Sequence, residues 1–211
     1  STEDELNKAK YDYAKNLANQ MKQSVNNPLF NFENLDEMYE DVMVGINGDS
    51  HILILNPASQ RVIDHIVNTV EEIISKYDVD GIHYDDYFYT SGGFEKYSET
   101  KLYSEYRRKG GTLGLEDWRR DNVDRMVYQV SEVVEKVNKE QNKRVAFGIS
   151  PAGIWAPGKE SCKDSRGIEG GMNVACGSYS SYLDLYADTK KWVEEEWIDY
   201  ILPQVYSSLG D

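Results

Sequence analysis

The stretch DVDGIHYDDYFY, residues 78–89, carries the alternation that decides the fold. Its polar residues His83 and Asp85 alternate with bulky neighbours, as side chains do on the two faces of a β-strand. Residues 144–150 repeat the pattern, with small residues such as Gly148 on one face and large apolar residues on the other. We therefore predict strands over 79–85 and 144–150, each with one small or polar face and one bulky, apolar face.

Amphipathic helices are predicted around these strands. After Asn56-Pro57, which supplies a cap and a first-turn proline, apolar residues recur at helical spacing from Val62 to Tyr77. A second strong helical face runs from Trp118 to Val137. Weaker signals predict an opening helix from Thr2 through Met21, a strand over 51–55, a short helix capped by Asp188 and a strand over 198–206. Residues 26–49 carry scattered aromatics and glycine, and we expect irregular structure or short helical pieces there.

The alternation of helices with short apolar strands predicts an α/β fold whose parallel sheet is covered by helices. Both a doubly wound sheet and a (β/α)8 barrel of the TIM type fit this order. A face that turns polar toward the carboxyl ends of the strands favours the barrel, because barrel enzymes place their sites there. We expect one barrel domain over residues 1–211, with a long glycine-rich rim loop over 156–181.

The composition argues against several classes of function. The 23 basic and 37 acidic residues give a formal net charge of -14, which opposes binding to a polyanion such as nucleic acid. No apolar run approaches the length of a transmembrane helix. Cys162 and Cys176 lie in the same glycine-rich stretch, where the sequence is compatible with either a disulfide or two free thiols.

Asp85 and Asp86 are adjacent carboxylates at the end of a predicted strand. By alternation Asp85 points into the mouth of the barrel, whereas Asp86 begins the following loop and points sideways, or caps that loop. Ionising both of two nearby carboxyl groups costs free energy because their charges repel, so one of them can be held protonated. Glycosidic cleavage requires such a protonated carboxyl group as its general acid. Together with Asp78 and Asp80 they match neither an EF-hand nor a zinc motif, so we expect no obligatory metal and no other cofactor.

Three longer segments follow one another along the chain: NPASQRVIDHIVNTVEEIISKYDVDGIHYDDYFY at 56–89, FGISPAGIW at 147–155 and LYADTKKWVEEEWIDYILPQVY at 185–206. In this order they resemble glycoside hydrolase-like family 10, a group of bacterial envelope proteins. The resemblance implies a TIM-type barrel in the cell envelope or outside the cell, acting on polysaccharides or oligosaccharides. For some members the implied substrate is peptidoglycan strands stripped of their peptides. Family barrels continue on both sides of these segments, so we expect an incomplete barrel whose open strand edges permit self-association.

The same resemblance implies that Asp85 is the principal catalytic carboxylate and Asp86 its neighbour. DGIHYDD is also similar to the D-G-x-R-x-D strand end of the α-amylase clan, whose last Asp is the nucleophile, with His83 in the place of Arg. The FGISPAG strand end has no carboxylate where that clan keeps its acid, so the proton donor is Asp86 or a group outside this chain. The alternative function is a non-catalytic glycan-binding barrel module.

Further candidates for contact with a glycan are His83, Tyr87, Trp155, Gln204 and Tyr206. His83 can bond to Asp85 or to a sugar hydroxyl, or its ring can be satisfied within the barrel. Trp155 can stack on a sugar ring or pack under the glycine-rich loop. Gln204 and Tyr206 share the inward face of the last predicted strand, where they can bind hydroxyl groups or belong to the core.

Overall fold

The computed structural model describes residues 4–5, 8–9, 11–12, 15–16, 40–47, 50–86, 88–89 and 99–206. The opening helix expected from Thr2 through Met21 falls largely outside these residues, and the described pairs within it are helical. The chain divides into two compact units, one formed by Ser1–His65 with Gly92–Leu113 and the other by Ile66–Ser91 with Gly114–Asp211. The single domain expected from the sequence stays a prediction.

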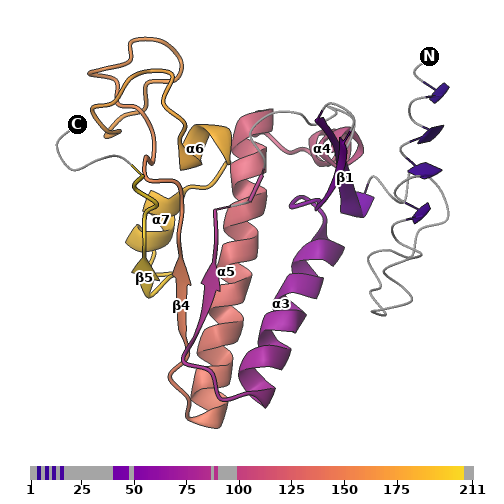
Figure 1. Ribbon diagram of the computed structural model, residues 1–211, viewed down its shortest axis with the longest axis vertical. Helices are drawn as coiled ribbons and strands as arrows, with labels where there is room; N and C mark the ends of the chain where they lie inside the picture. Colours follow the sequence, from indigo (N-terminus) through magenta and orange to yellow (C-terminus); the bar gives the residue numbers. More distant parts are fainter. Residues whose placement is uncertain are drawn as a thin grey trace. The chain divides into compact units, whose positions relative to one another are not determined.

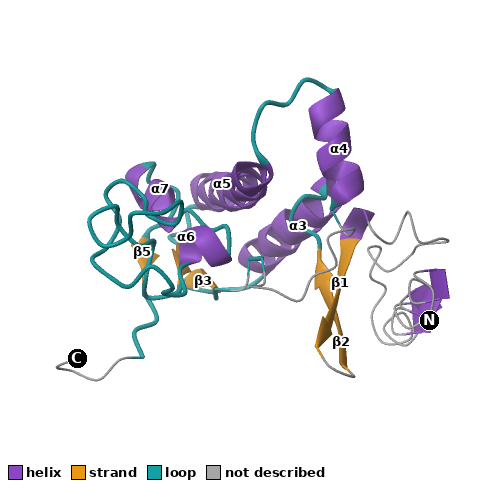
Figure 2. Ribbon diagram, turned by 90° about the horizontal axis from the view of Figure 1, so that it is seen from above, coloured by secondary structure: helices purple, strands orange, loops and turns teal. Residues whose placement is uncertain are grey.

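The first unit contains a two-stranded antiparallel sheet (Figure 2). Its strands are β1, Val42–Asn47, and β2, Ser50–Leu55, with Val42 paired to Leu55 and Asn47 to Ser50. The strand predicted over 51–55 is confirmed, whereas the irregular structure expected before it is wrong over β1. Only two residues separate the strands in sequence, which is the spacing of a tight hairpin. α4, Thr100–Arg108, also belongs to this unit.

The first long helix is α3, Gln60–Lys76. Ser59 caps it, because its Oγ accepts a hydrogen bond of 3.4 Å from the backbone N–H of Val62. The expected cap, Asn56, instead closes the turn before the helix, where its Oδ1 accepts from the N–H of Ala58 at 3.0 Å. The helix therefore begins at Gln60 and not at Pro57.

The second unit is built on a parallel sheet with the strand order β3-β4-β5 (Figure 1). The strands are β3, Gly81–Tyr84, β4, Ala146–Ile149, and β5, Tyr200–Ile201. The strands predicted over 79–85 and 144–150 are confirmed, but the last strand is much shorter than the predicted 198–206. Pro203 has no N–H with which to continue the ladder. Beyond it, as far as the described residues extend, the pairing is reduced to an isolated bridge between Gln204 and Ala152.

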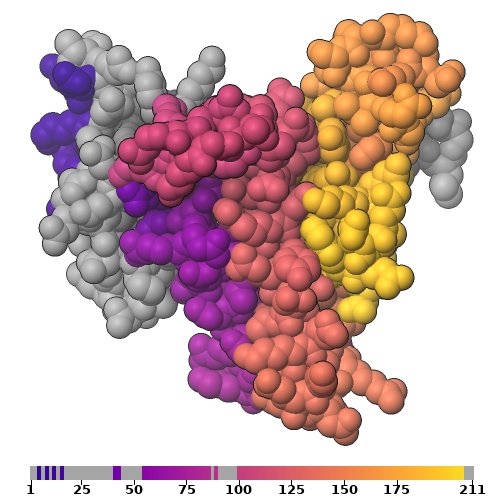
Figure 3. All heavy atoms as spheres, turned by 180° about the vertical axis from the view of Figure 1, so that it is seen from behind, coloured from indigo at the N-terminus to yellow at the C-terminus, as the bar shows by residue number. Residues whose placement is uncertain are grey.

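Helices pack on this sheet and on one another. α5, Leu115–Gln141, contacts β4. It also contacts α7, Thr189–Glu194, and the segments that contain the two helices lie side by side in Figure 3. Phe147 and Ile149 of β4 are buried on the bulky face that the sequence predicts. The valines of α5 that are buried are Val123, Val127, Val130, Val133, Val134 and Val137. These apolar side chains form the core of the unit.

A buried carboxylate joins α5 to α7. Asp124 accepts hydrogen bonds of 2.7 Å from the indole N–H of Trp192 and from Nζ of Lys191. Burial raises the pKa of Asp124, and these two donors oppose that shift. Asp188 caps α7 as predicted, accepting from the N–H of Lys191 at 3.3 Å.

The described residues thus form a mixed α/β structure with an open parallel sheet. The α/β class expected from the sequence is confirmed, while the TIM-type barrel, expected to be incomplete in this chain, stays a proposal. Within the described part of the chain, no helix combines the length and apolar character needed to cross a membrane.

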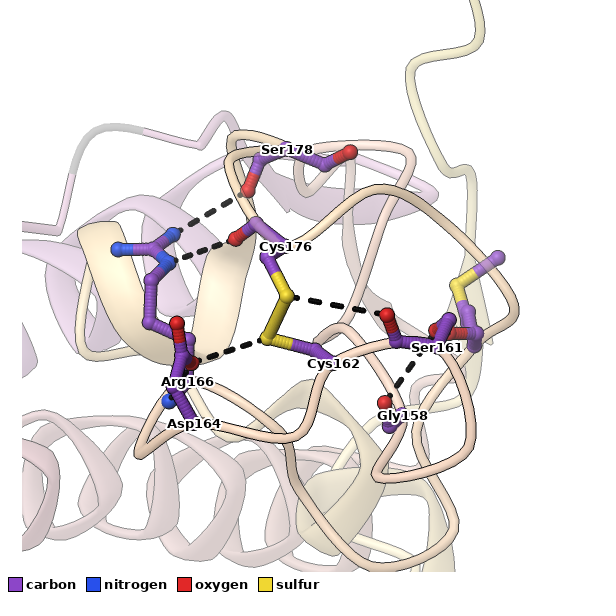
Figure 4. The surroundings of a disulfide bond; sticks show 8 residues. Gly158, Ser161, Cys162, Asp164, Arg166, Cys176 and Ser178 are labelled. Atoms are coloured by element: carbon purple, nitrogen blue, oxygen red, sulfur yellow. Dashed lines mark hydrogen bonds between the residues drawn. A yellow bond between two sulfur atoms is a disulfide. The ribbon is translucent and has the colours of Figure 1, made fainter.

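The glycine-rich loop over 156–181 is tied together by its own contacts and leads into α6, Ser181–Asp184. Cys162 and Cys176 form a disulfide, one of the two states that the sequence left open (Figure 4). Arg166 donates from Nε to the carbonyl of Cys176 at 2.8 Å and pairs with Asp184 at 3.1 Å. Two isolated parallel bridges close the loop further, Pro157 with Met172 and Gly158 with Ile168.

Removing the disulfide should destabilise this unit. The double variant Cys162→Ser with Cys176→Ser is expected to lose about 3 kcal/mol of unfolding free energy, because the bridge closes a segment with a sequence separation of 14. Urea unfolding followed by tryptophan fluorescence measures the loss, since all 4 tryptophans lie in the second unit. Ser165→Ala, an exposed change in the same loop, is the matched control. Equal midpoints for the double variant and the wild type would contradict the expectation.

Candidate active site

The carboxyl ends of the three parallel strands meet at one edge of the sheet. The backbone N–H of Ser150 donates to the carbonyl of Tyr84 at 2.8 Å, which holds the end of β4 beside that of β3. On the other side of β4, the N–H of Gln204 donates to the carbonyl of Pro151 at 2.9 Å. Asp85, Ser150 and Gln204 therefore lie at the same edge, as expected for a site at the end of parallel strands.

Gly148 leaves room for a stacked pair on the small face of the sheet. It is paired in register with His83 on one side and with Tyr200 on the other. A Cβ atom at Gly148 would overlap the ring of Tyr200. In the absence of that atom the rings of His83 and Tyr200 stack, with centroids 5.6 Å apart and an interplanar angle of 15°.

The ring of His83 is held by protein groups. Its Nδ1 lies 3.0 Å from the hydroxyl of Tyr200, and its Nε2 lies 2.6 Å from Oγ of Ser150. Of the alternatives open for His83, this geometry matches a ring satisfied within the fold. Ser150 also belongs to the site, although its sequence pattern predicts only a small inward-facing residue. Its place at the end of a strand is the feature of the sequence that could have identified it as a site residue.

Asp85 is exposed, and one of its oxygens has two donors. Its Oδ1 accepts from Nε2 of Gln204 at 2.7 Å and from the backbone N–H of Asp86 at 2.9 Å. Gln204 also donates to the carbonyl of Ser150 at 2.9 Å and accepts from the hydroxyl of Tyr206 at 2.6 Å. The structure therefore brings together Asp85, Asp86, Gln204 and Tyr206.

Asp86 has a different environment from its neighbour. It is half-buried, and its Oδ1 is buried without a hydrogen-bond partner among the described residues. Desolvation is the main cause that raises the pKa of Asp86, and the charge of Asp85 raises it further. A hydrogen bond from its own backbone and one from Gln204 act in the opposite direction. Asp86 thus binds a proton more readily than an ordinary aspartate does.

A pocket of about 550 Å³ opens beside Asp86. Its wall is mostly apolar and combines the end of β4, the disulfide-closed loop and the segment after β5. The lining residues are Asp86, Ala152, Gly153, Ile154, Met172, Val174, Tyr179, Gln204, Val205 and Tyr206. A volume of this size can hold part of a small ligand.

Trp155, another aromatic candidate, is not among the described residues that line this pocket. Trp155 donates from its indole nitrogen to Asp188 at 3.1 Å, and its ring contacts Tyr182 with centroids 5.2 Å apart. Nζ of Lys190 lies 5.1 Å from the centroid of the same ring. Tyr87 lies outside the described residues. Contact of either side chain with a sugar stays a prediction.

A side chain at Gly148 should disrupt the stacked pair. Gly148→Ala is expected to lose about 1–3 kcal/mol of unfolding free energy, because the added methyl group forces Tyr200 and the strand to move. Gly177→Ala is the control, since a Cβ atom there meets no atom of a described residue within 4 Å. Urea unfolding of both variants measures the loss of unfolding free energy. A Gly148→Ala protein as stable as the control would show that the stacked pair does not need the space left by Gly148.

The raised pKa of Asp86 predicts a pH-dependent effect on stability. A carboxyl group that holds its proton more tightly in the folded state lowers the unfolding free energy as pH rises through the interval between its two pKa values. Asp86→Asn should therefore be more stable than the wild type at pH 7, by no more than about 1 kcal/mol because solvent screens a half-buried group. The difference should vanish below the ordinary pKa of 3.8.

Chemical unfolding at pH 7 and at pH 3 measures this difference. Asp80→Asn, a change at an exposed residue just before β3, is the matched control and should show no such gain. A loss of stability in Asp86→Asn at pH 7 would contradict the assignment of a desolvated carboxyl group.

Comparison with known proteins places these residues in a wider group. The model of a family described as Glycosyl hydrolase-like 10 matches residues 19–211. Glycosyl hydrolase YngK of Bacillus subtilis is 37% identical over 159 residues, which cover 75% of this chain and 29% of the relative. Glycosyl hydrolase DigH of Escherichia coli and of Shigella flexneri is 35% identical over 156 residues, which cover 72% of this chain and 31% of the relative. The chain thus spans less than a third of the length of these curated relatives.

Proposed function

The chain belongs to the glycosyl hydrolase-like 10 family, and we propose that it cleaves glycosidic bonds with Asp85 and Asp86 as its catalytic pair. One observation carries the proposal: two adjacent carboxyl groups share a strand end but have opposite environments. Asp85 is exposed and accepts two hydrogen bonds, whereas Asp86 has a raised pKa and a buried oxygen that bonds to none of the described residues. Pairs of carboxyl groups that differ in this way divide the acid and base roles of a glycosidase.

The two side chains take complementary roles in the proposed reaction. Protonated Asp86 gives its proton to the glycosidic oxygen as the bond from that oxygen to the anomeric carbon breaks. The carboxylate of Asp85 stabilises the positive charge that develops on the sugar ring, or attacks the anomeric carbon. Water then adds to the anomeric carbon and gives a proton to Asp86. Where Asp85 has formed an ester with that carbon, the water displaces it and breaks the ester bond, so that both carboxyl groups end in their starting states.

The pocket beside Asp86 suits one part of the substrate. Its mostly apolar lining fits the carbon-bearing face of a sugar ring, and the exposed ring of Tyr206 lies at its edge. The substrate is a polysaccharide or oligosaccharide, and peptide-free peptidoglycan strands are the first glycan to test. The parallel order β3-β4-β5 and the polar carboxyl edge support a TIM-type barrel as the complete fold.

A location outside the cytoplasm is part of the proposal. The disulfide between Cys162 and Cys176 supports it, because disulfides persist mainly in oxidising compartments.

The test is release of reducing ends from a glycan panel that includes peptide-free peptidoglycan strands and α- and β-glucans. Asp85→Asn is expected to lower turnover by about 10³-fold or more, because the charge that stabilises the transition state is lost. Asp86→Asn should lower it by about 10²–10⁴-fold on natural glycans, and by much less on aryl glycosides whose leaving group needs no proton. Asp78→Asn, at an exposed residue before β3, is the control and should retain full activity.

Near-normal turnover by Asp85→Asn would refute the catalytic assignment. Saturable glycan binding by the folded wild type, with no bond cleavage on any member of the panel, would instead support the glycan-binding module.

A further inference from the structure

We infer that Gln204, oriented by Tyr206, is a positioning residue for Asp85 and not a contact for substrate hydroxyl groups. The inference rests on the proposed catalytic role of Asp85. It concerns the same edge of the sheet but assigns Gln204 and Tyr206 a role that the sequence pattern does not suggest, since that pattern places both side chains only on an inward face.

Three partners fix the orientation of the Gln204 amide. Nε2 faces the carboxylate of Asp85 and the carbonyl of Ser150, and both of these oxygens can only accept. Oε1 faces the hydroxyl of Tyr206, which can donate. Exchanging the amide oxygen and nitrogen would place acceptor against acceptor twice, so the pattern of partners determines which way the amide points.

The backbone of Gln204 is fixed as firmly as its amide. Its N–H donates to the carbonyl of Pro151 at 2.9 Å, and it forms the parallel bridge with Ala152. The amide hydrogen bond to Ser150 adds a second attachment to the end of β4. Gln204 therefore ties Asp85, at the end of β3, to a rigid point on the neighbouring strand.

This arrangement divides the two oxygens of Asp85. Oδ1 is occupied by Gln204 and by the N–H of Asp86. Apart from the neighbouring carboxyl group of Asp86, no further described residue bonds to the Asp85 carboxylate, so Oδ2 is the oxygen left to face the anomeric carbon. Holding a reacting group in one orientation removes part of the entropy cost of the reaction, which makes a group that fixes this carboxylate valuable for turnover.

Gln204 and Tyr206 have no donor left for a hydroxyl group of a sugar, although the ring of Tyr206 remains exposed. The amide hydrogens of Gln204 are directed at the carboxyl groups of Asp85 and Asp86 and at the carbonyl of Ser150, and the single hydroxyl hydrogen of Tyr206 is donated to Oε1. A residue that binds a hydroxyl group of the substrate changes KM, whereas a residue that orients a catalytic carboxylate changes kcat. The two roles are therefore separable by kinetics.

Tyr206→Phe provides the cleanest test, because the side chain is 89% exposed and the change removes only the hydroxyl group. With the most active glycan of the panel, we expect kcat to fall about fivefold in Tyr206→Phe and about 10²-fold in Gln204→Ala, with KM within about twofold of the wild type. Tyr77→Phe, at a residue 61% exposed beyond the end of α3, is the control and should change neither constant.

The double variant shows whether Tyr206 acts through Gln204. Adding Tyr206→Phe to Gln204→Ala should lower kcat no further, because the hydroxyl group then has no amide to orient. Additive losses, or a raised KM with unchanged kcat in either single variant, would overturn the inference. Loss of activity in Asp85→Asn alongside normal kcat in Tyr206→Phe and Gln204→Ala would overturn this inference but leave the proposed function standing. Normal turnover in Asp85→Asn would overturn the proposed function itself.

Discussion

The parallel register of β3, β4 and β5 is the constraint on which the rest of the site depends. It brings Asp85 within hydrogen-bond distance of Gln204, a residue 119 positions later in the chain. A slip of one residue in either pairing would turn every side chain to the opposite face and separate these partners. The site is therefore a property of strand pairing, and the polar residues contribute only after the backbone has placed them.

One face of the short strands packs in the core and stabilises the unit, whereas the other face carries the polar groups of the site. On one face Phe147 and Ile149 are buried in the core with the valines of α5. On the other face Gly148 leaves the space in which His83 and Tyr200 stack. Because alternate residues of one strand serve both faces, the packed core sets the positions of the polar groups at the strand end.

Periodicity in the sequence is enough to predict α5, the bulk of α3, the capped helix at Asp188 and the strands that end at Asp85 and Ser150. Alternation also places Asp85 on the polar face at the strand end. Local patterns do not identify partners that are distant in sequence. For this reason the sequence does not decide whether Cys162 and Cys176 form a disulfide, and it does not predict the hydrogen bond from the indole of Trp155 to Asp188. The hairpin of β1 and β2 is missed because glycine and polar residues near residue 48 signal a break as readily as a tight turn.

The sequence alone does not predict how Asp85 and Asp86 differ, because the two side chains are identical and adjacent. The fold gives them different hydrogen bonds and different exposure to solvent. Gln204 and the backbone N–H of Asp86 supply donors to Asp85, whereas Asp86 shares its pocket with Met172 and Val174 of the disulfide-closed loop. Apolar neighbours cannot solvate a charge, and desolvation is the largest cause of the raised pKa of Asp86. The disulfide-closed loop, held by Cys162–Cys176 and by Arg166, thereby supplies part of the apolar wall of the pocket that Asp86 lines.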